Sequence, residues 1–435
     1  MSSQNTHTRE RAVLHRAGHV LLALTLAANT ACNSLLDVDN PGNVPSDALS
    51  DPALMATLEI AALQQTQCAI ANYAATAGML SGEYWSANGF VNNHIWEWRG
   101  IVEIKGNPGS CPGSRATTSM GFYTPLQQAR FQTEDAFNRM SALTDAQVPN
   151  RQRYMVEMRA YGGYALLLLA EGMCEMAIDN GPKMTTAEVL AIAEKHFTDA
   201  IAQVNSATDA AFTAADRASL KNMATAGRAR ARLDLGNLSG AAADAALIPA
   251  GYVRVAEFSE TTPSRENRIY NLTVRNDFLS TAPAYQNLTL EDGTPDPRVK
   301  VTDMKRKGSD NVTPIFQQQK FQGSGAVPLP IASYAEAQLI LAEATGGSAG
   351  LDAINRVRAL SKIPPLVLQP GQDFQTALLE ERRRQLFSEG QRYGDMLRKK
   401  LPFSSGVNRK GQTISSLTCV PLPDVETQNN PNLKG

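Results

Sequence analysis

Apolar residues recur at intervals of three and four positions through long stretches of the chain, which is the spacing of one face of an α-helix. The clearest run lies near the middle of the chain: Tyr154, Met158, Tyr161, Ala165 and Leu168. Strict alternation of apolar and polar residues is confined to short pieces such as 252–255, which predict short strands. The pattern therefore predicts a mostly α-helical protein.

Polar turns divide the central region into helix pairs. Thr185 and Glu188 have the spacing of a capping box and predict the start of a helix. A Gly-Asn turn at 236–237 separates a predicted helix over 217–235 from another over 239–247. Two antiparallel helices joined by a tight turn, then repeated, are typical of tetratricopeptide proteins.

The rest of the mature chain completes this organisation. We expect a scaffold of tetratricopeptide-like helix pairs over about 49–80, 117–248 and 331–400. Residues from about 251 to 330 are rich in Gly, Pro, Asn and Gln and predict a loop-rich, irregular subdomain. The tail from residue 421 predicts coil.

The apolar pattern does not decide the secondary structure of two segments. Residues 374–399 predict either one long helix or two consecutive ones. Residues 81–112 lack a helical period and predict an irregular segment, within which Trp96 and Trp98 alternate like one face of a strand.

The N-terminus has the pattern of an export signal. Arginines between positions 9 and 16 precede an apolar stretch over 17–28, which is too short to span a bilayer. Ala31 and Cys32 then resemble a lipobox, in which Asn29 replaces the usual aliphatic residue. We expect residues 1–31 to be removed and Cys32 to carry acyl chains such as palmitate, which would anchor the protein to a membrane. Plain signal cleavage and a buried helix are the alternatives.

Four cysteines remain after Cys32, an even number that suggests two disulfides in an exported chain. Of the three possible connectivities we favour Cys68–Cys111 together with Cys174–Cys419. Reduced, buried thiols are the alternative. None of these cysteines has CxxC spacing, so we expect no metal or redox site.

Charge and motifs exclude several function classes. The chain has 41 Lys and Arg against 42 Asp and Glu, so a nucleic-acid partner is not expected. His196 lies on an apolar helix face and predicts a core histidine, and no nucleotide-binding or nucleophile motif occurs. We therefore expect no catalytic residue and no cofactor. A glycan hydrolase stays as an alternative, because it needs only two carboxylates.

One segment has the composition of a carbohydrate site. All three tryptophans lie within it, beside asparagines and an arginine: Trp85, Asn88, Asn92, Asn93, Trp96, Trp98 and Arg99. Aromatic planes stack on the apolar faces of sugars, whereas amides and guanidinium groups bind their hydroxyls. We therefore expect these residues to contribute to a ligand site. Core packing of the tryptophans is the alternative.

Five segments in the later part of the chain resemble the SusD/RagB-like family of nutrient-uptake outer-membrane lipoproteins. They are Asp296–Arg298, Tyr334–Ala344, Ala353–Arg358, Leu379–Arg398, and Val420–Pro423 with Asn430–Pro431. Ser333 and Gln385 replace the usual Arg and Glu. In these motifs Leu379, Leu386 and Tyr393 predict a core seam, whereas Glu389, Arg392 and Asp395 predict a structural ion ladder.

The resemblance implies a function. A member of this family would be anchored by lipid at the cell outer membrane, exposed at the surface, and would capture a glycan, a peptide or another oligomeric nutrient. It would deliver this ligand to a SusC-like TonB-dependent channel and would not be an enzyme. The alternative is a tetratricopeptide-like scaffold that binds only other proteins and has no small-molecule site.

Overall fold

The computed structural model describes residues 46, 48–114 and 120–433. The export signal and Cys32 lie outside the described residues. The chain divides into two compact units, residues 1–51 and 52–435. Of the first, the structure describes a short 3-10 helix, η1 (Ala48–Ser50). The second holds every other element.

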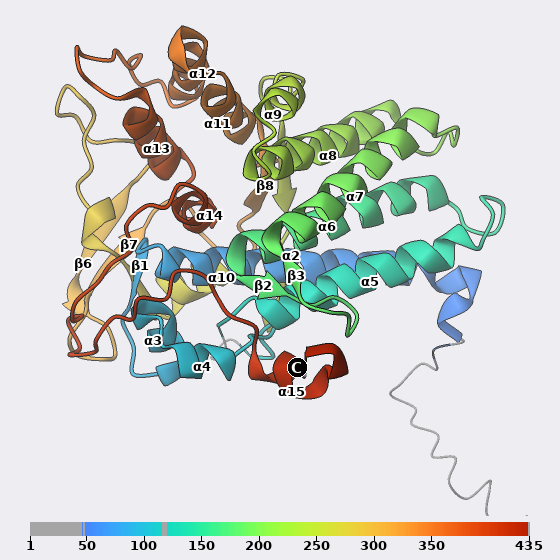
Figure 1. Ribbon diagram of the computed structural model, residues 1–435, viewed down its shortest axis with the longest axis horizontal. Helices are drawn as coiled ribbons and strands as arrows, with labels where there is room; N and C mark the ends of the chain where they lie inside the picture. Colours follow the sequence, from blue (N-terminus) through green and yellow to red (C-terminus); the bar gives the residue numbers. More distant parts are fainter. Residues whose placement is uncertain (1–45, 47, 115–119, 434–435) are drawn as a thin grey trace, which may run out of the picture. The chain divides into compact units, whose positions relative to one another are not determined.

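Six helices between residues 55 and 245 pack together in the second unit (Figure 1). They are α2 (Met55–Leu80), α5 (Tyr123–Ser141), α6 (Arg151–Gly172), α7 (Thr186–Ser206), α8 (Ala214–Asp234) and α9 (Leu238–Ala245). Each packs against the next along the chain, from α2 through α9. The fold is therefore mostly α, with consecutive helix pairs of the tetratricopeptide type.

Local sequence explains how these helices begin and how closely they pack. The capping box of Thr185 and Glu188 starts α7, as the spacing predicts. Gly163 of α6 and Gly227 of α8 leave room for Phe197 of α7, because a Cβ atom would lie 2.7 and 2.5 Å from its ring at these two positions. The three helices can therefore approach closely around one buried aromatic ring.

A second group of helices comes from the C-terminal part of the chain. It contains α11 (Tyr334–Thr345), α12 (Gly347–Leu360), α13 (Phe374–Gln385) and α14 (Gln391–Arg398). The predicted helical segment 374–399 is thus two helices. The break between them contains Ser388 and Gly390, both at positive φ. The half-buried Leu379 departs from the predicted seam, and Leu378 faces the core instead.

Residues 251–330 form the expected loop-rich subdomain, with short helices η3 (Pro263–Arg265), α10 (Arg268–Tyr270), η4 (Asn271–Arg275) and η5 (Pro283–Tyr285). Its strands pair two by two and antiparallel. β4 (Val253–Ala256) pairs with β8 (Leu329–Ser333), and β6 (Val301–Lys307) with β7 (Pro314–Gln318). β5 (Leu279–Thr281) pairs with β1 (Tyr84–Ser86), so the insert holds the tryptophan segment in place. A small pair, β2 (Glu175–Met176) and β3 (Met184–Thr185), links α6 to α7.

Two predictions of irregular structure were wrong. The segment 81–112 contains β1, α3 (Val91–Trp98) and α4 (Ile101–Lys105), so Trp96 and Trp98 lie on a helix and not on a strand. The C-terminal tail contains α15 (Asp424–Asn429) and η6 (Pro431–Leu433). In α3 no side chain caps the N-terminus, but Ile95 and Trp96 pack into the main core. Tertiary packing here overrides a weak local preference.

Both favoured disulfides are present. Cys68 of α2 bonds Cys111, and Cys174, just after α6, bonds Cys419. Across the part of the chain that the structure describes, no helix is long and apolar enough to cross a membrane.

Candidate ligand-binding site

Trp85 lies on β1 with its side chain on the opposite face from its neighbours. Tyr84 and Ser86 are fully buried, whereas Trp85 is half-buried. The pairing of Trp85 with Ser280 of β5 fixes this register, and successive residues of a strand point to opposite faces. The indole ring is therefore presented outward from the core.

The ring lines a cleft of about 520 Å³, which we call the Trp85 cleft. Its walls come from three distant parts of the chain: β1 with α3, residues 282–284, and the loop 404–414. The lining residues are Met79, Gly82, Tyr84, Trp85, Glu97, Ala282, Pro283, Ala284, Ser404, Val407, Asn408, Arg409 and Ile414. This volume lies in the range of small-molecule sites.

Arg409 places a guanidinium group over one face of Trp85, with 4.4 Å between its Cζ atom and the ring centroid. Glu97 and the carbonyl oxygen of Ser86 accept hydrogen bonds from this guanidinium, and Thr313 Oγ1 accepts another at 2.7 Å. Because Glu97 also accepts a hydrogen bond from the Ser86 amide at 2.7 Å, the arginine is held rigidly. One side of the cleft thus combines an aromatic plane with a fixed hydrogen-bond donor.

Arg99 holds the loop that carries Arg409. It is 2% exposed, and its guanidinium donates to the carbonyl oxygens of Ser404 and Ser415 at 2.6 and 2.8 Å. Lys410, farther along the loop, pairs with Asp310 at 2.8 Å. Arg99 thus shapes the cleft without lining it.

The other predicted site residues lie in the interior. The buried Asn88 donates to the carbonyl oxygen of Phe278 at 2.8 Å and accepts from the amide of Phe90 at 2.8 Å. Trp96 is 1% exposed and packs near Phe122. Trp98 is half-buried against the main core.

The two remaining asparagines of the segment also lie away from the cleft. Asn92 accepts a hydrogen bond from Asn107 at 3.0 Å. Asn93 is fully buried, and neither amide atom has a hydrogen-bond partner among the described residues. Of the predicted site residues, Trp85 is therefore the one that lines the Trp85 cleft.

Two walls of the cleft escaped the sequence analysis. Residues 282–284 and 404–414 contain short turn-forming sequences without aromatic clusters, and nothing in their composition connects them to Trp85. Gly406 and Gly411, both at positive φ, mark turns within the second segment. The hydrogen bonds of Arg99 and Arg409 hold the loop 404–414 at the cleft, whereas residues 282–284 directly follow β5, which pairs with β1.

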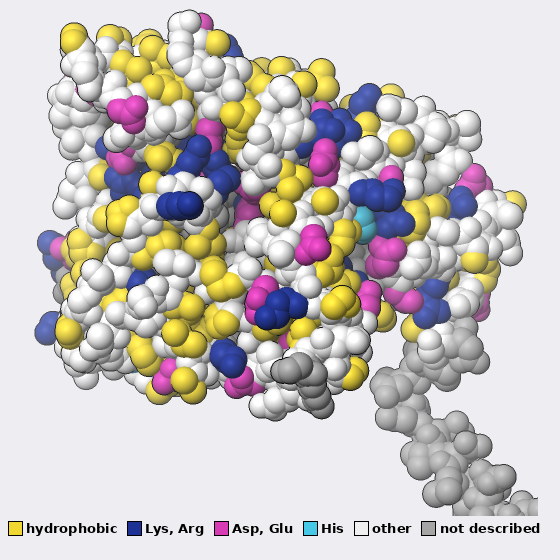
Figure 2. Space-filling view, viewed as in Figure 1, with side chains coloured by type: hydrophobic (Ala, Val, Ile, Leu, Met, Phe, Trp, Pro, Cys, Tyr) yellow, Lys and Arg dark blue, Asp and Glu magenta, His cyan; other side chains and the backbone are white. Residues whose placement is uncertain are grey.

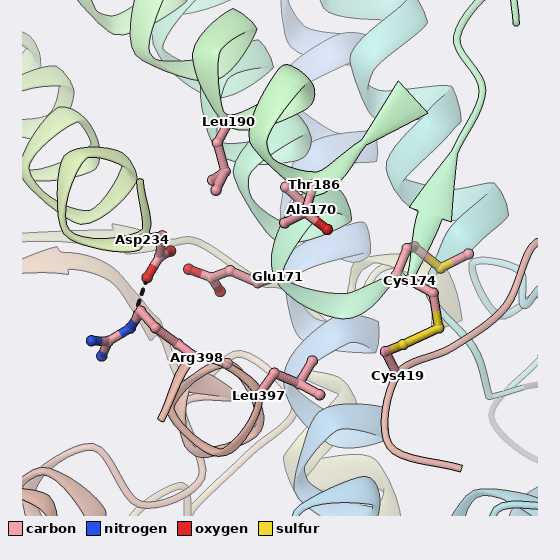
Figure 3. Close-up of a pocket in the computed structure, with 11 residues that line it drawn as sticks. Ala170, Glu171, Cys174, Thr186, Leu190, Asp234, Leu397, Arg398 and Cys419 are labelled. Carbon is pink, nitrogen blue, oxygen red and sulfur yellow. Dashed lines mark ion pairs between the residues drawn. A yellow bond between two sulfur atoms is a disulfide. The ribbon is translucent and has the colours of Figure 1, made fainter. Parts of the chain in front are cut away.

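A separate pocket of about 370 Å³ lies among α6, α7, α8 and α14, beside the Cys174–Cys419 bond (Figure 3). The Glu171 and Asp234 carboxylates face one another there, and Arg398 pairs with Asp234 at 3.0 Å. Burial and the neighbouring Glu171 raise the pKa of Asp234 well above its usual range. Arg230 holds Glu171 with two hydrogen bonds of 2.6 and 2.5 Å. These ion pairs link α8 to α6 and to α14, which indicates a structural role.

The ion pairs of this segment lie both within α14 and between elements. Asp395 pairs with Arg398 of the same helix at 2.9 Å and with Arg382 of α13 at 2.8 Å, whereas Glu389 precedes α14 and pairs with Lys320 at 2.7 Å. The network is structural, as expected, but Glu389 has its partner in another element because the chain breaks before α14. Figure 2 shows Lys and Arg side chains gathered over α13 and α14.

Many hydrolytic sites use a metal ion or a pair of carboxylates, so both kinds of group are informative among the described residues. None of them forms a group of His, Cys, Asp or Glu that could hold a metal ion. Among the residues that line the Trp85 cleft, Glu97 is the one carboxylate, and a glycosidase needs two. His196 is largely buried, and burial lowers its pKa to about 4, as for a neutral core histidine.

Comparisons with known proteins agree on the fold. The model of the SusD family matches residues 203–434. A SusD-like carbohydrate-binding protein from Bacteroides vulgatus superposes with a TM-score of 0.63 at 13% identity, over 88% of this chain and 97% of that chain. A SusD superfamily protein from Bacteroides fragilis gives 0.61 at 15% identity, over 87% and 99%. A SusD-like carbohydrate-binding protein from Bacteroides fragilis gives 0.52 at 17% identity, over 83% and 98%. No curated protein matches the chain at a significant level.

Proposed function

The chain belongs to the SusD family, and from this premise we propose that it captures a carbohydrate in the Trp85 cleft. The observation that carries the proposal is the outward-facing indole ring of Trp85 beside the fixed guanidinium of Arg409. A sugar presents an apolar face to the ring and hydroxyl groups to the guanidinium. The solved structures described above as carbohydrate-binding proteins support this ligand class.

We further propose that the protein works at the outer membrane, held by acyl chains on Cys32, and passes its ligand to a SusC-like TonB-dependent channel. The basic and apolar pattern before Cys32 supports the anchor. Family membership supports the channel. The partnership is tested by extracting the tagged protein from the membrane at native expression levels and asking whether the channel co-purifies with it. Absence of the channel from the purified protein would contradict the proposal.

The ligand site is tested by substitution at Trp85. An array of defined glycans identifies a ligand, and isothermal titration then measures its affinity. Trp85→Ala should weaken binding by ~1–3 kcal/mol, taking stacking of bases on aromatic rings as a guide. Trp85→Phe keeps a ring and should recover part of the loss. Unchanged affinity in Trp85→Ala would remove Trp85 from the site.

Trp96→Ala is the matched control for this test. It removes a tryptophan of the same segment from the core, which should cost about 3–5 kcal/mol of folding free energy. Trp85→Ala should change the melting temperature far less, because the ring is half-buried. A large loss of stability in both variants would assign both rings to the core.

The anchor is tested at Cys32. Cys32→Ala should release the protein from the membrane fraction, and mass spectrometry of the wild-type protein should find acyl chains on Cys32, because the thiol is the acylation site of a lipoprotein signal. A Cys32→Ala protein that stays in the membrane fraction would contradict the proposal.

A further inference from the structure

A second cleft, which we call the α5 cleft, is separate from the Trp85 cleft. Its volume is about 330 Å³, and its walls come from α5, the turn 177–180 and α15. It shares no lining residue with the Trp85 cleft. In Figure 1, α15 lies below the first turns of α5, whereas β1 lies toward the left of the view.

The floor of the α5 cleft is a continuous row of hydrogen-bonded polar side chains. Tyr123 donates to Glu426 at 2.9 Å, and Gln127 donates to the hydroxyl oxygen of Tyr123 at 3.2 Å. Gln127 in turn accepts from Arg130 at 3.1 Å, and Arg130 donates two hydrogen bonds to Asp179 at 3.1 and 2.5 Å. Each planar group is fixed by its neighbours before any ligand arrives.

Arg130 and Asp179, the last two members of this row, differ in exposure. The Arg130 side chain is 9% exposed, whereas the Asp179 side chain is 62% exposed. Arg130 therefore anchors Asp179 from below, and each Asp179 oxygen keeps a lone pair that faces the solvent. A bidentate Arg–Asp pair holds both oxygens in a fixed plane. Such a plane suits two adjacent hydroxyl groups.

An unpaired aromatic ring flanks the row. Phe131 is 56% exposed, and on the same cleft Val425 is 48% exposed. An exposed ring of this size beside fixed polar groups can stack on the apolar face of a sugar while the polar groups bind its edge. A protein partner would need a broader apolar surface than these two side chains provide.

We propose that the α5 cleft is a second carbohydrate subsite, which takes one or two neutral sugar units with adjacent hydroxyl groups. Phe131 stacks on the ring of the sugar, and the carboxylate of Asp179 and Oε1 of Gln127 accept hydrogen bonds from its hydroxyls. Gln127 accepts because both of its amide hydrogens are already donated, to Tyr123 and to the carbonyl oxygen of Ala177. The inference rests on the proposed carbohydrate function but not on the Trp85 cleft. Two sites on one molecule would hold one long glycan with greater avidity than either site alone.

The test uses the full chain and a panel of maltohexaose, cellohexaose, xylohexaose, mannohexaose and laminarihexaose. Hydrogen exchange with mass spectrometry reads two groups of peptides, one covering 123–131 and 177–180 and the other covering 84–86 and 404–414. At least one oligosaccharide should protect the first group. This protection should persist in Trp85→Ala.

Phe131→Ala should raise the oligosaccharide concentration that protects 123–131 by about five- to 150-fold, the range that loss of aromatic stacking gives. Phe131→Tyr should restore it. Leu238→Ala is the matched control, since Leu238 is 45% exposed on α9, and it should leave both groups unchanged. An unchanged melting temperature of Phe131→Ala shows that the variant folds.

The possible outcomes separate the two proposals. Protection of 84–86 and 404–414 alone overturns the second subsite and leaves the Trp85 proposal standing. Protection of 123–131 alone supports the second subsite and contradicts the Trp85 site. Absence of protection in both groups across the panel overturns both.

Discussion

Glu83 is a buried carboxylic acid two residues before Trp85. It is fully buried, and Oε1 accepts a hydrogen bond from the amide of Ser388 at 3.2 Å, whereas Oε2 has no partner among the described residues. Burial raises its pKa from 4.5 to about 7. At pH 7 and below, the neutral carboxyl group is therefore favoured in the folded protein.

Glu83→Gln should stabilise the protein above pH 7. Between pH 4.5 and about 7 the folded chain keeps a proton that the unfolded chain releases, so stability falls as the pH rises through this window. The amide cannot ionise and avoids a cost of about 3 kcal/mol. Urea unfolding at roughly pH 5 and pH 8 measures the difference.

Glu188→Gln is the control for this prediction. Glu188 is exposed, and the backbone hydrogen bond of the capping box lowers its pKa. Its replacement should give no gain at the higher pH. An equal gain in both variants would show that the effect comes from overall charge and not from burial of Glu83.

Sequence composition locates the tryptophan segment but does not rank its residues. Trp85 and Trp96 are the same residue type in one short stretch, and their exposure depends on partners that lie far away in the sequence. The pairing of β1 with β5 turns Trp85 outward, whereas Trp96 packs near Phe122. The buried role of Arg99 depends on Ser404 and Ser415 and has no local signal.

Gly390 sets the angle between α13 and α14. Its φ is +83°, and a Cβ atom would lie 2.8 Å from Cα of Ala74 in α2. Gly390→Ala should therefore destabilise the protein by roughly 2–5 kcal/mol, through left-handed strain and overpacking. Thermal or urea unfolding measures the loss.

Gly89→Ala provides the comparison for Gly390→Ala. Nothing lies within 4 Å of a Cβ atom built at Gly89, and its φ is not in the left-handed region. Its stability should stay within about 0.5 kcal/mol of the wild type. A neutral effect at Gly390 would show that α2 and α14 can separate without cost.

Elements with strong local signals were predicted well. α7 begins at its capping box, and the turn at 236–237 separates α8 from α9. α3 was missed because it is short, has no side-chain cap, and is stabilised by packing of Trp96. Periodicity over 374–399 could not show the break, because the positive φ of Ser388 leaves no mark in the apolar pattern.

At the scale of the whole molecule, two disulfides close loops of very different length. Cys68 and Cys111 are 43 positions apart, whereas Cys174 and Cys419 are 245 apart. In the chain-entropy model, replacement of both cysteines by serine should cost about 4 kcal/mol for the first pair and about 5 for the second. Unfolding of the two double variants in urea compares them.

A larger loss for the first pair would show that local strain or packing outweighs loop length. Intact protein labelled under unfolding, non-reducing conditions is the control, and none of the four cysteines should react. The connectivity itself was one of three that the sequence allows, and the placement of Cys419 beside α6 depends on the complete fold.

The reach of the second disulfide also sets an order of events during biogenesis. At a synthesis rate of roughly 5–20 residues per second, Cys419 appears about 12–50 s after Cys174. Until Cys419 arrives, Cys174 is a thiol without its native partner and can exchange with a disulfide between Cys68 and Cys111. The native bond forms only after the last segment of the chain has arrived. An oxidant acting on the nascent chain would therefore produce mispaired species, which pulse-chase labelling with non-reducing electrophoresis would reveal, and a chain truncated before Cys419 would remain reactive at Cys174.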